Sequence, residues 1–284
     1  MASSRGSNAT SSSADVSSAV GGATLTFAAR GGRTVLVDSH VRAPVALVRP
    51  FPLADGGQLV QLITIGPGLC GGDRLCIYIA AETGARVVLT TPAATRVLSM
   101  DAGQHAEQCV DLRVAAGATV EYYPAITIPF PDSAFRQTIS VDAAEGARVG
   151  VLETWALGRT ARAEYLAFRS LSSRTTLEVD GELLYAEATE LDPSRDRLTG
   201  AGVLAQRRYL ASGFWFGVRL PEDAPASVDD NDVLVAMAQS TPAVAYLRAL
   251  ASDATSLETT LGGAAARIAA AWEHAPVSFA RFRC

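Results

Sequence analysis

Lysine is absent from this chain, because all 24 of its basic residues are arginine. The absence excludes chemistry that requires a Schiff-base lysine or the lysine of a phosphate-binding P-loop. Histidine is scarce as well: His40, His105 and His274 are scattered along the sequence and form no evident catalytic group. The formal net charge of −5 argues against nucleic acid as the main partner.

Cysteine is also sparse. Cys70, Cys76, Cys109 and Cys284 form none of the close pairs of a zinc site, and a chain of 284 residues has no evident need for disulfide bonds. Cys70 and Cys76 flank a Gly-Gly-Asp loop and could meet in a hairpin, but their spacing matches no common structural metal site. We therefore expect ordinary reduced thiols.

Long apolar runs are missing too. No run approaches the ~18 residues of a membrane-spanning helix, so no membrane contact is expected. Residues 1–22 are rich in serine and alanine without an apolar signal-peptide core, and we interpret them as a disordered extension. Apolar residues make up 49% of the chain, enough for a sizeable core, and the length suits one large β domain or two ordinary ones. We expect a single domain over residues 23–284. We expect a soluble, cytoplasmic protein.

What the chain does contain is a repeated strand pattern around three Gly-Ala pairs, at Gly84, Gly117 and Gly146. On both sides of each pair every second residue is apolar, which is the period of a half-buried strand. A glycine loop between two such runs predicts a hairpin. One hairpin cannot bury its apolar face alone, so the recurrence predicts a mainly β fold of superhelical or stacked strand repeats. A weaker fourth copy surrounds Gly32.

Other segments predict the remaining elements. Asp180-Gly181, between the apolar runs at 175–179 and 182–185, predicts a tight hairpin. Residues 230–251 have apolar side chains at a helical period interrupted at Thr241-Pro242, and the alanine-rich residues 263–272 predict a second helix. We therefore expect a small helical element between about residues 229 and 274, near the C-terminal end of a β body.

The repeat also places polar side chains in the interior. Two sets of positions share the parity of the buried residues, namely Thr91, Pro124 and Glu153 after the glycines, and Leu75, Gln108 and Gln137 before them. A buried carboxylate without a partner is costly, so Glu153 needs a hydrogen bond, a cation or a water-filled passage. The alternative is that bulges turn these groups to solvent, or that they bond neighbouring backbone.

Further candidates for chemistry have little support nearby. Thr90 and Thr91 could supply a hydroxyl nucleophile, but an activating base would be required. Arg159, which follows Gly158, is interpreted as an ion-pair partner for Glu153 or Glu164.

Five ordered segments resemble the urease accessory protein family called UreD or UreH. They are Gly-Gly-Asp-Arg-Leu at 71–75 with Leu-Thr-Thr-Pro-Ala-Ala-Thr-Arg-Val at 89–97, Val-Glu-Tyr-Tyr-Pro at 120–124 with Ile-Pro-Phe at 128–130, Phe-Arg-Gln at 135–137, Glu-Thr-Trp at 153–155, and Gly-Arg at 158–159 with Glu164. The resemblance covers roughly residues 44–185. This chain departs from the family at Ala125 and Ile126, where an acidic residue and a second proline are usual, and residues after 220 match poorly.

The resemblance implies a superhelical β protein with an assembly role and no enzymatic activity. Family members bind apo-urease and a UreF-like accessory protein, through which a nickel-delivering UreG-like GTPase is recruited. The resemblance also implies transient nickel in an internal passage and no tightly bound cofactor, in keeping with the lack of a His/Cys cluster. The nickel-passage or structural candidates are Asp73, Thr90, Thr91, Glu121, Glu153 and Arg159.

Two alternatives to the nickel passage stay open at this point. One is a β-solenoid hydrolase that uses Glu153 and Asp73 as paired inward carboxylates. The other is a purely structural scaffold without any passage. For Glu153 itself, the alternative to a place in the passage is an ion pair with Arg159.

Overall fold

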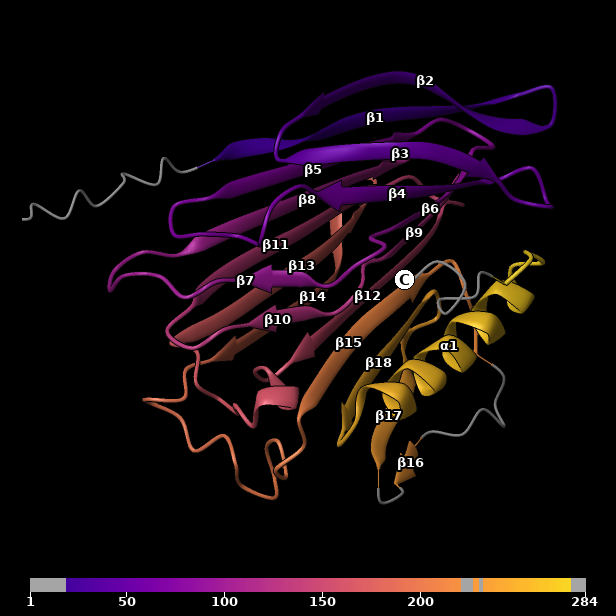
Figure 1. The fold of residues 1–284 in the computed structure, drawn as a ribbon. Helices are drawn as coiled ribbons and strands as arrows, with labels where there is room; N and C mark the ends of the chain where they lie inside the picture. Colours follow the sequence, from indigo (N-terminus) through magenta and orange to yellow (C-terminus); the bar gives the residue numbers. More distant parts are fainter. Residues whose placement is uncertain (1–18, 221–226, 230–231, 277–284) are drawn as a thin grey trace, which may run out of the picture.

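The computed structural model describes residues 19–220, 227–229 and 232–276, and these residues form a two-sheet β structure with one long helix (Figure 1). The expected extension at residues 1–22 lies almost entirely outside the described residues. Residues 20–22, however, belong to the first strand, so the last residues of the expected extension are part of the sheet. The mainly β fold predicted from the repeats is confirmed.

The first sheet has seven strands. In spatial order they are β14 (Glu182–Leu191), β13 (Ser170–Val179), β11 (Ala134–Ala143), β8 (Ala106–Val114), β5 (Arg74–Ala81), β1 (Val20–Arg30) and β2 (Arg33–Arg42). From β1 to β13 all neighbours run parallel, and β2 and β14 close the two edges antiparallel.

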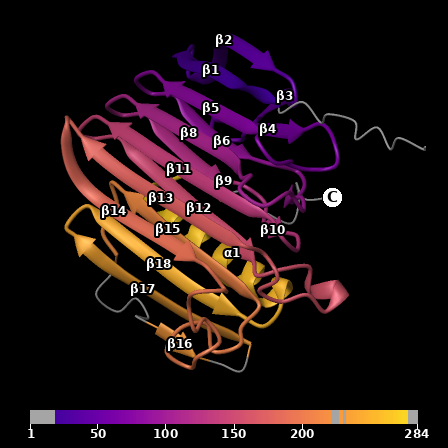
Figure 2. The same cartoon turned by 90° about the vertical axis from the view of Figure 1, so that its left-hand side faces the viewer.

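The second sheet has eleven strands. Its main path is β16 (Ser227–Asp229), β17 (Val233–Thr241), β18 (Val244–Ala251), β15 (Tyr209–Phe216), β12 (Arg148–Ala156), β9 (Thr119–Tyr123), β6 (Arg86–Thr90), β4 (Gln58–Thr64) and β3 (Val45–Pro52). The short strands β7 (Thr95–Val97) and β10 (Thr127–Pro129) pair beside this path. Figure 2 shows the strands of both sheets stacked in nearly sequential order.

The three strong repeats are arches and not hairpins, which corrects the expectation. In each repeat the strand before the glycine lies in the first sheet and the strand after it lies in the second. Each strand pairs in parallel with its equivalent in the next repeat, as Ile77 does with Val110 and Val110 with Ile139. Hairpins and arches have the same period-two pattern, so periodicity alone does not separate them. The weaker copy around Gly32 is a true hairpin.

The main core fills the space between the two sheets. Strands of the first sheet alternate between buried and more exposed residues, whereas β6, β9 and nearly all of β12 are buried on both faces. The reason is a second apolar cluster on the outer face of the second sheet, where Trp215 meets residues of the C-terminal helix. Buried parallel strands are continuously apolar for this reason.

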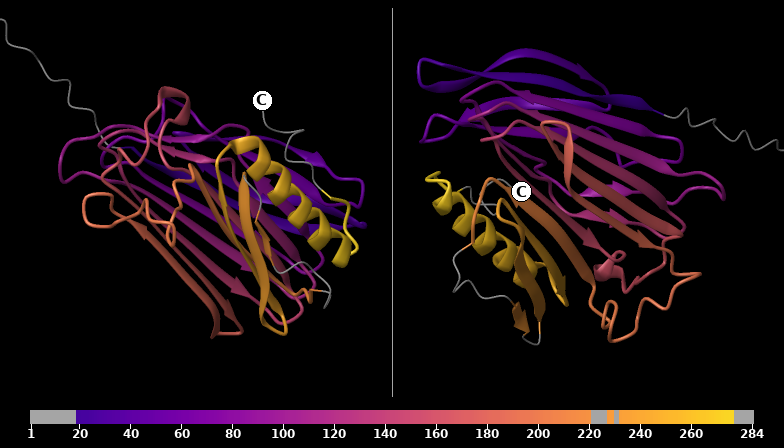
Figure 3. Two further views of the ribbon diagram at one scale, coloured as in Figure 1. Left: turned by 90° about the horizontal axis from the view of Figure 1, so that it is seen from below. Right: turned by 180° about the vertical axis from the view of Figure 1, so that it is seen from behind.

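The helix α1 (Ala254–Ala271) covers that outer face (Figure 3). Asp253 caps its start by accepting a hydrogen bond from the Ser256 amide at 2.9 Å. The helix expected over residues 263–272 is therefore confirmed, with an earlier start. Within the described ranges, no helix combines the length and apolarity needed to cross a membrane.

The helix expected over residues 230–251 is wrong. Residues 230–231 lie outside the described residues, and the rest forms the antiparallel strands β17 and β18. In β17, Val233, Val235 and Met237 are buried while Leu234 is exposed, which is a strand period. The apolar Leu234 on the outer side made the segment look helical. The hairpin at Asp180-Gly181 is confirmed as the connection from β13 to β14.

The cysteines also differ from expectation. Cys76 on β5 and Cys109 on β8 are register partners in neighbouring strands, and their sulfur atoms are bonded at 2.11 Å. Reduced thiols at these two positions were therefore a wrong prediction, because parallel stacking of the repeats places the two side by side. Cys70 and Cys76, which the sequence allowed to meet in a hairpin, are not bonded to each other, and Cys70 is a free thiol as expected.

Candidate functional site

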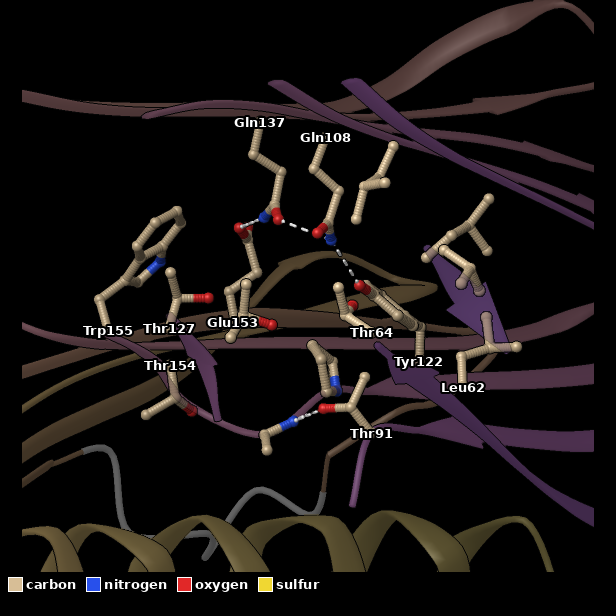
Figure 4. A pocket seen from close by; sticks show the side chains of 16 residues that line it. Leu62, Thr64, Thr91, Gln108, Tyr122, Thr127, Gln137, Glu153, Thr154 and Trp155 are labelled. Carbon is tan, nitrogen blue, oxygen red and sulfur yellow. Dashed lines mark hydrogen bonds between the residues drawn. The ribbon is translucent and has the colours of Figure 1, made fainter. Parts of the chain in front are cut away.

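A row of polar side chains crosses the otherwise apolar space between the sheets. In the first sheet Gln108, Gln137 and Ser173 occupy matched register positions on β8, β11 and β13, and Thr175 follows Ser173 on the same face. Glu153 projects toward them from β12 of the second sheet (Figure 4). We call Gln108, Gln137, Glu153, Ser173 and Thr175 the polar row.

Glu153 is the centre of this row. Its carboxylate accepts hydrogen bonds from Gln137 Nε2, from Ser173 Oγ at 2.7 Å and from Thr175 Oγ1 at 3.1 Å. The amide of Gln108 extends the network by donating to Gln137 Oε1 at 3.1 Å and to the Tyr122 hydroxyl oxygen at 3.2 Å (Figure 4). The predicted inward orientation of Glu153, Gln108 and Gln137 is therefore confirmed, and the alternative that bulges turn them to solvent is wrong.

The hydrogen-bond partners of Glu153 are neutral, and this determines its electrostatics. Only 4% of the residue is exposed, and burial raises the pKa of its carboxyl to about 7, with the nearby charge of Glu187 adding to the rise. The hydrogen bonds from Ser173, Thr175 and Gln137 hold the pKa below the value that burial alone would give. Glu153 can therefore change its charge near neutral pH.

The structural alternative for Glu153, an ion pair with Arg159, is wrong. Arg159 instead binds Glu164 through two hydrogen bonds, one of which joins Nε to Oε2 at 2.7 Å. Its guanidinium also stacks on the ring of Phe130, with 4.3 Å from Cζ to the ring centroid. Arg159 therefore fixes the loop after β12 and leaves Glu153 without a cationic partner there.

A small cavity of about 20 Å³ adjoins the polar row, with room for about one water molecule. Its wall includes Gln108, Gln137, Glu153, Tyr122 and Thr91 (Figure 4). The cavity also shares wall residues with two others, of about 60 Å³ beside residues 92–96 and about 210 Å³ beneath α1. The interior polar groups thus lie next to hollows that extend toward the loops and the helix.

The two threonines of the Thr-Thr-Pro segment hold backbone together. Thr91 lines the small cavity, and its hydroxyl accepts from the Ala125 amide at 2.9 Å and donates to the Ala93 carbonyl at 3.2 Å. Thr90 is buried and donates to the Tyr123 carbonyl at 2.7 Å. Both hydroxyls donate to backbone carbonyls, an arrangement that supports loop positioning over nucleophilic chemistry.

Glu121 belongs to a different cluster. It accepts from Arg86 Nη2 at 3.2 Å, and Arg86 also pairs with Asp55 and donates to the Ala275 carbonyl at 3.0 Å. Burial raises the pKa of Glu121, while the charge of Arg86 opposes that rise. Because side chains alternate along β9, Glu121 points away from the neighbouring Tyr122 and hence away from the polar row.

Asp73 also lies apart from the polar row. Its carboxylate accepts from the amides of Ala19 at 2.7 Å and Cys70 at 2.8 Å, so it closes the Gly-Gly-Asp loop onto the start of β1. Asp73 is not among the residues that line the small cavity. The paired carboxylates that the hydrolase hypothesis requires, Glu153 and Asp73, are therefore not brought together.

Sequence reasoning missed Ser173 and Thr175. A signal was present, because both share the parity of Leu171 and Leu177 within a single strand, which the structure buries. Their partnership with Glu153 needed the tertiary fold, since Glu153 lies in the opposite sheet. Across the described ranges 19–220, 227–229 and 232–276, no group of three or more His, Cys, Asp or Glu residues is arranged to hold a metal ion.

Comparison with known proteins gives one consistent family. The model of the family described as UreD urease accessory protein matches residues 19–284. The protein named urease accessory protein UreD of Deinococcus radiodurans is 37% identical over 191 residues, which cover 67% of this chain and 68% of that protein. UreD 1 of Synechococcus sp. (strain JA-3-3Ab) is 38% identical over 192 residues, 67% of this chain and 71% of that protein. UreD 2 of Streptomyces griseus subsp. griseus is 37% identical over 205 residues, 69% of each.

Proposed function

The chain belongs to the UreD urease accessory protein family, and on this premise we propose that it is a urease maturation factor which acts in assembly and catalyses no reaction. The observation that carries the proposal is the family match over residues 19–284. In this role the protein binds apo-urease together with a UreF-like accessory protein, which recruits a UreG-like GTPase. Nickel is its cargo and passes through it toward the urease active site.

The polar row is the part of the interior suited to such a cargo. Oxygen atoms of Glu153, Ser173, Thr175 and the two glutamines are hard ligands, which bind a nickel ion more weakly than a cluster of thiolate or imidazole groups would. Weak, successive binding permits an ion both to enter and to leave. The carboxylate of Glu153 supplies the negative charge that favours a cation, and among the described residues no arginine belongs to its hydrogen-bond network.

The partner assignment is tested by co-expression. The protein should co-purify with a UreF-like protein and with the urease subunits, and alone it should be poorly soluble because surface intended for partners is exposed. A chain that stays soluble by itself and ignores these partners would contradict the assignment. The purified chain should also turn over neither urea nor simple esters and glycosides.

Passage of nickel is tested with Glu153→Gln, which keeps the shape of the side chain and removes its charge. We expect the variant to assemble with apo-urease and to leave less nickel bound to it, measured by metal analysis together with complex yield. Glu164→Gln is the matched control, since it alters a carboxylate that pairs with Arg159 outside the polar row. Normal nickel loading with normal assembly in Glu153→Gln would remove Glu153 from the route.

A further inference from the structure

Further polar side chains lie beyond the polar row, between Glu153 and the edge of the first sheet at β14. On the inner face of the second sheet Glu153 is the register partner of Ser212 on β15, and Ser212 is the register partner of Arg248 on β18. Register partners in antiparallel strands point to the same face of a sheet. Ser212 is 5% exposed, so a buried hydroxyl stands between the interior carboxylate and Arg248.

The first sheet continues the same row on its side. Ser173 pairs in register with Thr189 on β14, and Thr175 pairs with Glu187. The polar side chains of the two sheets thus extend together toward the edge formed by β14. Glu187 lies close enough for its charge to raise the pKa of Glu153. Thr175 connects the two, because it donates to Glu153 and neighbours Glu187 across the strands.

An ion pair joins the two sheets at this outer end. Arg248 Nη1 lies 3.0 Å from Glu187 Oε1 and 3.5 Å from Thr189 Oγ1. The side chain of Glu187 is 8% exposed, whereas that of Arg248 is 45% exposed. The hydroxyl of Tyr185 donates to the other oxygen of Glu187, and the Tyr185 ring packs on Phe214 with 4.9 Å between centroids. Glu187 is therefore held firmly, and Arg248 is the partner that can move into solvent.

We propose that the Arg248–Glu187 ion pair is a gate that closes the outer end of the polar row. With the pair formed, a guanidinium stands between the row and solvent and repels a cation on either side of it. When Arg248 turns outward, Glu187 becomes the next carboxylate beyond Glu153 that a cation can bind. The outer end of the polar row is then open to solvent between β14 and β18. The inference rests on the proposed function for the identity of the cation, nickel.

The test measures how well the interior shields nickel from a chelator. The complete activation complex with apo-urease is first loaded with nickel, excess EDTA is then added to one portion, and urease-bound nickel is measured in both portions. Arg248→Met keeps the apolar stem of the side chain but removes the charge. Glu187→Gln, a second variant, removes the other partner at nearly constant shape. Arg195→Met is the control, because Arg195 and Glu190 form a fully solvated pair with both side chains 72% exposed.

The wild type and Arg195→Met are expected to keep most of their nickel transfer in EDTA. Arg248→Met is expected to load urease normally without EDTA and to lose about fivefold of that loading with EDTA, the ratio that corresponds to a single ion pair. Glu187→Gln also removes a carboxylate that faces the cation, so its loading with EDTA is compared with its own loading without EDTA, and the same fivefold ratio is expected. If EDTA removes no more nickel from an assembled variant than from the wild type, the gate hypothesis is wrong, whereas the proposed passage is unaffected. EDTA sensitivity already in the wild type would instead overturn the passage itself, and the gate with it.

Discussion

Two buried glutamates on neighbouring strands of the second sheet, Glu121 and Glu153, differ in how their carboxylates are stabilised. Glu121 is 2% exposed and is paired with Arg86, which also holds Asp55 and the backbone after α1. Glu153 is 4% exposed, and its hydrogen-bond donors within the described part of the chain are all neutral. A buried ion pair fixes structure, whereas a buried carboxylate among neutral donors keeps a charge that a cation or proton can neutralise.

The difference favours Glu153 over Glu121 as a member of the proposed nickel passage. The network of Arg86 ties the loop at Asp55 and the segment at Ala275 to the second sheet, a structural task. The pKa of Glu153, raised to about 7, lets its charge respond near physiological pH. Strongly shifted pKa values of this kind are commoner at functional sites than at structural ones.

The largest effect is expected from breaking the Glu121 cluster with Arg86→Met. The change leaves two carboxylates without their cation, one of them fully buried, and should reduce the free energy of unfolding by about 3–5 kcal/mol. Chemical denaturation of the protein in complex with its UreF-like partner measures the loss of stability, and soluble yield provides a second measure. Arg30→Met is the control, because Arg30 and Glu82 form an exposed pair at 3.4 Å. If Arg86→Met is as stable as Arg30→Met, the cluster of Arg86, Asp55 and Glu121 does not stabilise the fold.

A second prediction concerns pH. The pKa of Glu153 rises from an ordinary value of 4.5 to about 7 on folding, so the folded state binds the proton more tightly than the unfolded state. The cost of burying the charge is absent below about pH 4.5, grows between pH 4.5 and 7, and is complete above pH 7, on the order of 3 kcal/mol. Wild-type stability should therefore fall with rising pH in that window relative to Glu153→Gln. Parallel pH profiles of the two proteins would contradict the raised pKa.

A smaller effect sharpens the same contrast. Ser173→Ala removes one neutral donor to Glu153, so the carboxylate becomes less stable and its pKa rises further. Stability should fall by about 1–2 kcal/mol at pH 8 and much less at pH 4, where the carboxyl is protonated. Ser172→Ala, on the opposite face of β13, is the control and should have little effect at either pH. A loss that is the same at both pH values would indicate packing alone.

The smallest effects are expected at the two threonines. Thr91→Val removes hydrogen bonds to Ala125 and Ala93 beside the small cavity, and Thr90→Val removes the bond to the Tyr123 carbonyl on the face of Glu121. Each substitution should lower the free energy of unfolding by about 0.5–1.5 kcal/mol, and the loss should be larger for Thr90, which is more buried. Thermal unfolding measures both. Complete loss of nickel transfer in Thr91→Val without loss of stability would show a direct part in the passage.

Several features of the fold follow from sequence alone. The period-two runs around Gly84, Gly117 and Gly146 predict stacked strands, and each of these glycines adopts a positive φ between 71° and 78° at its turn. The same parity predicts that Glu153 and Gln137 face the interior, where both are buried. Local rules suffice here because alternation along a strand depends only on the backbone.

Long-range pairing determined the rest. The repeats could have been hairpins or arches, since both need the same alternation, and only stacking against neighbouring repeats selected arches and brought Cys76 beside Cys109. The strands β17 and β18 replaced an expected helix because β18 pairs with β15.

The partners of the buried charges were decided in the same way. Arg159 pairs with Glu164 of its own loop, while Glu153 accepts hydrogen bonds from Ser173 and Thr175 of the opposite sheet. The sequence by itself determined which side chains face the interior, because that depends on the strand's own alternation. The tertiary structure decided which of them meet, because contact between two sheets depends on how distant repeats stack and not on any residue's neighbours in the chain.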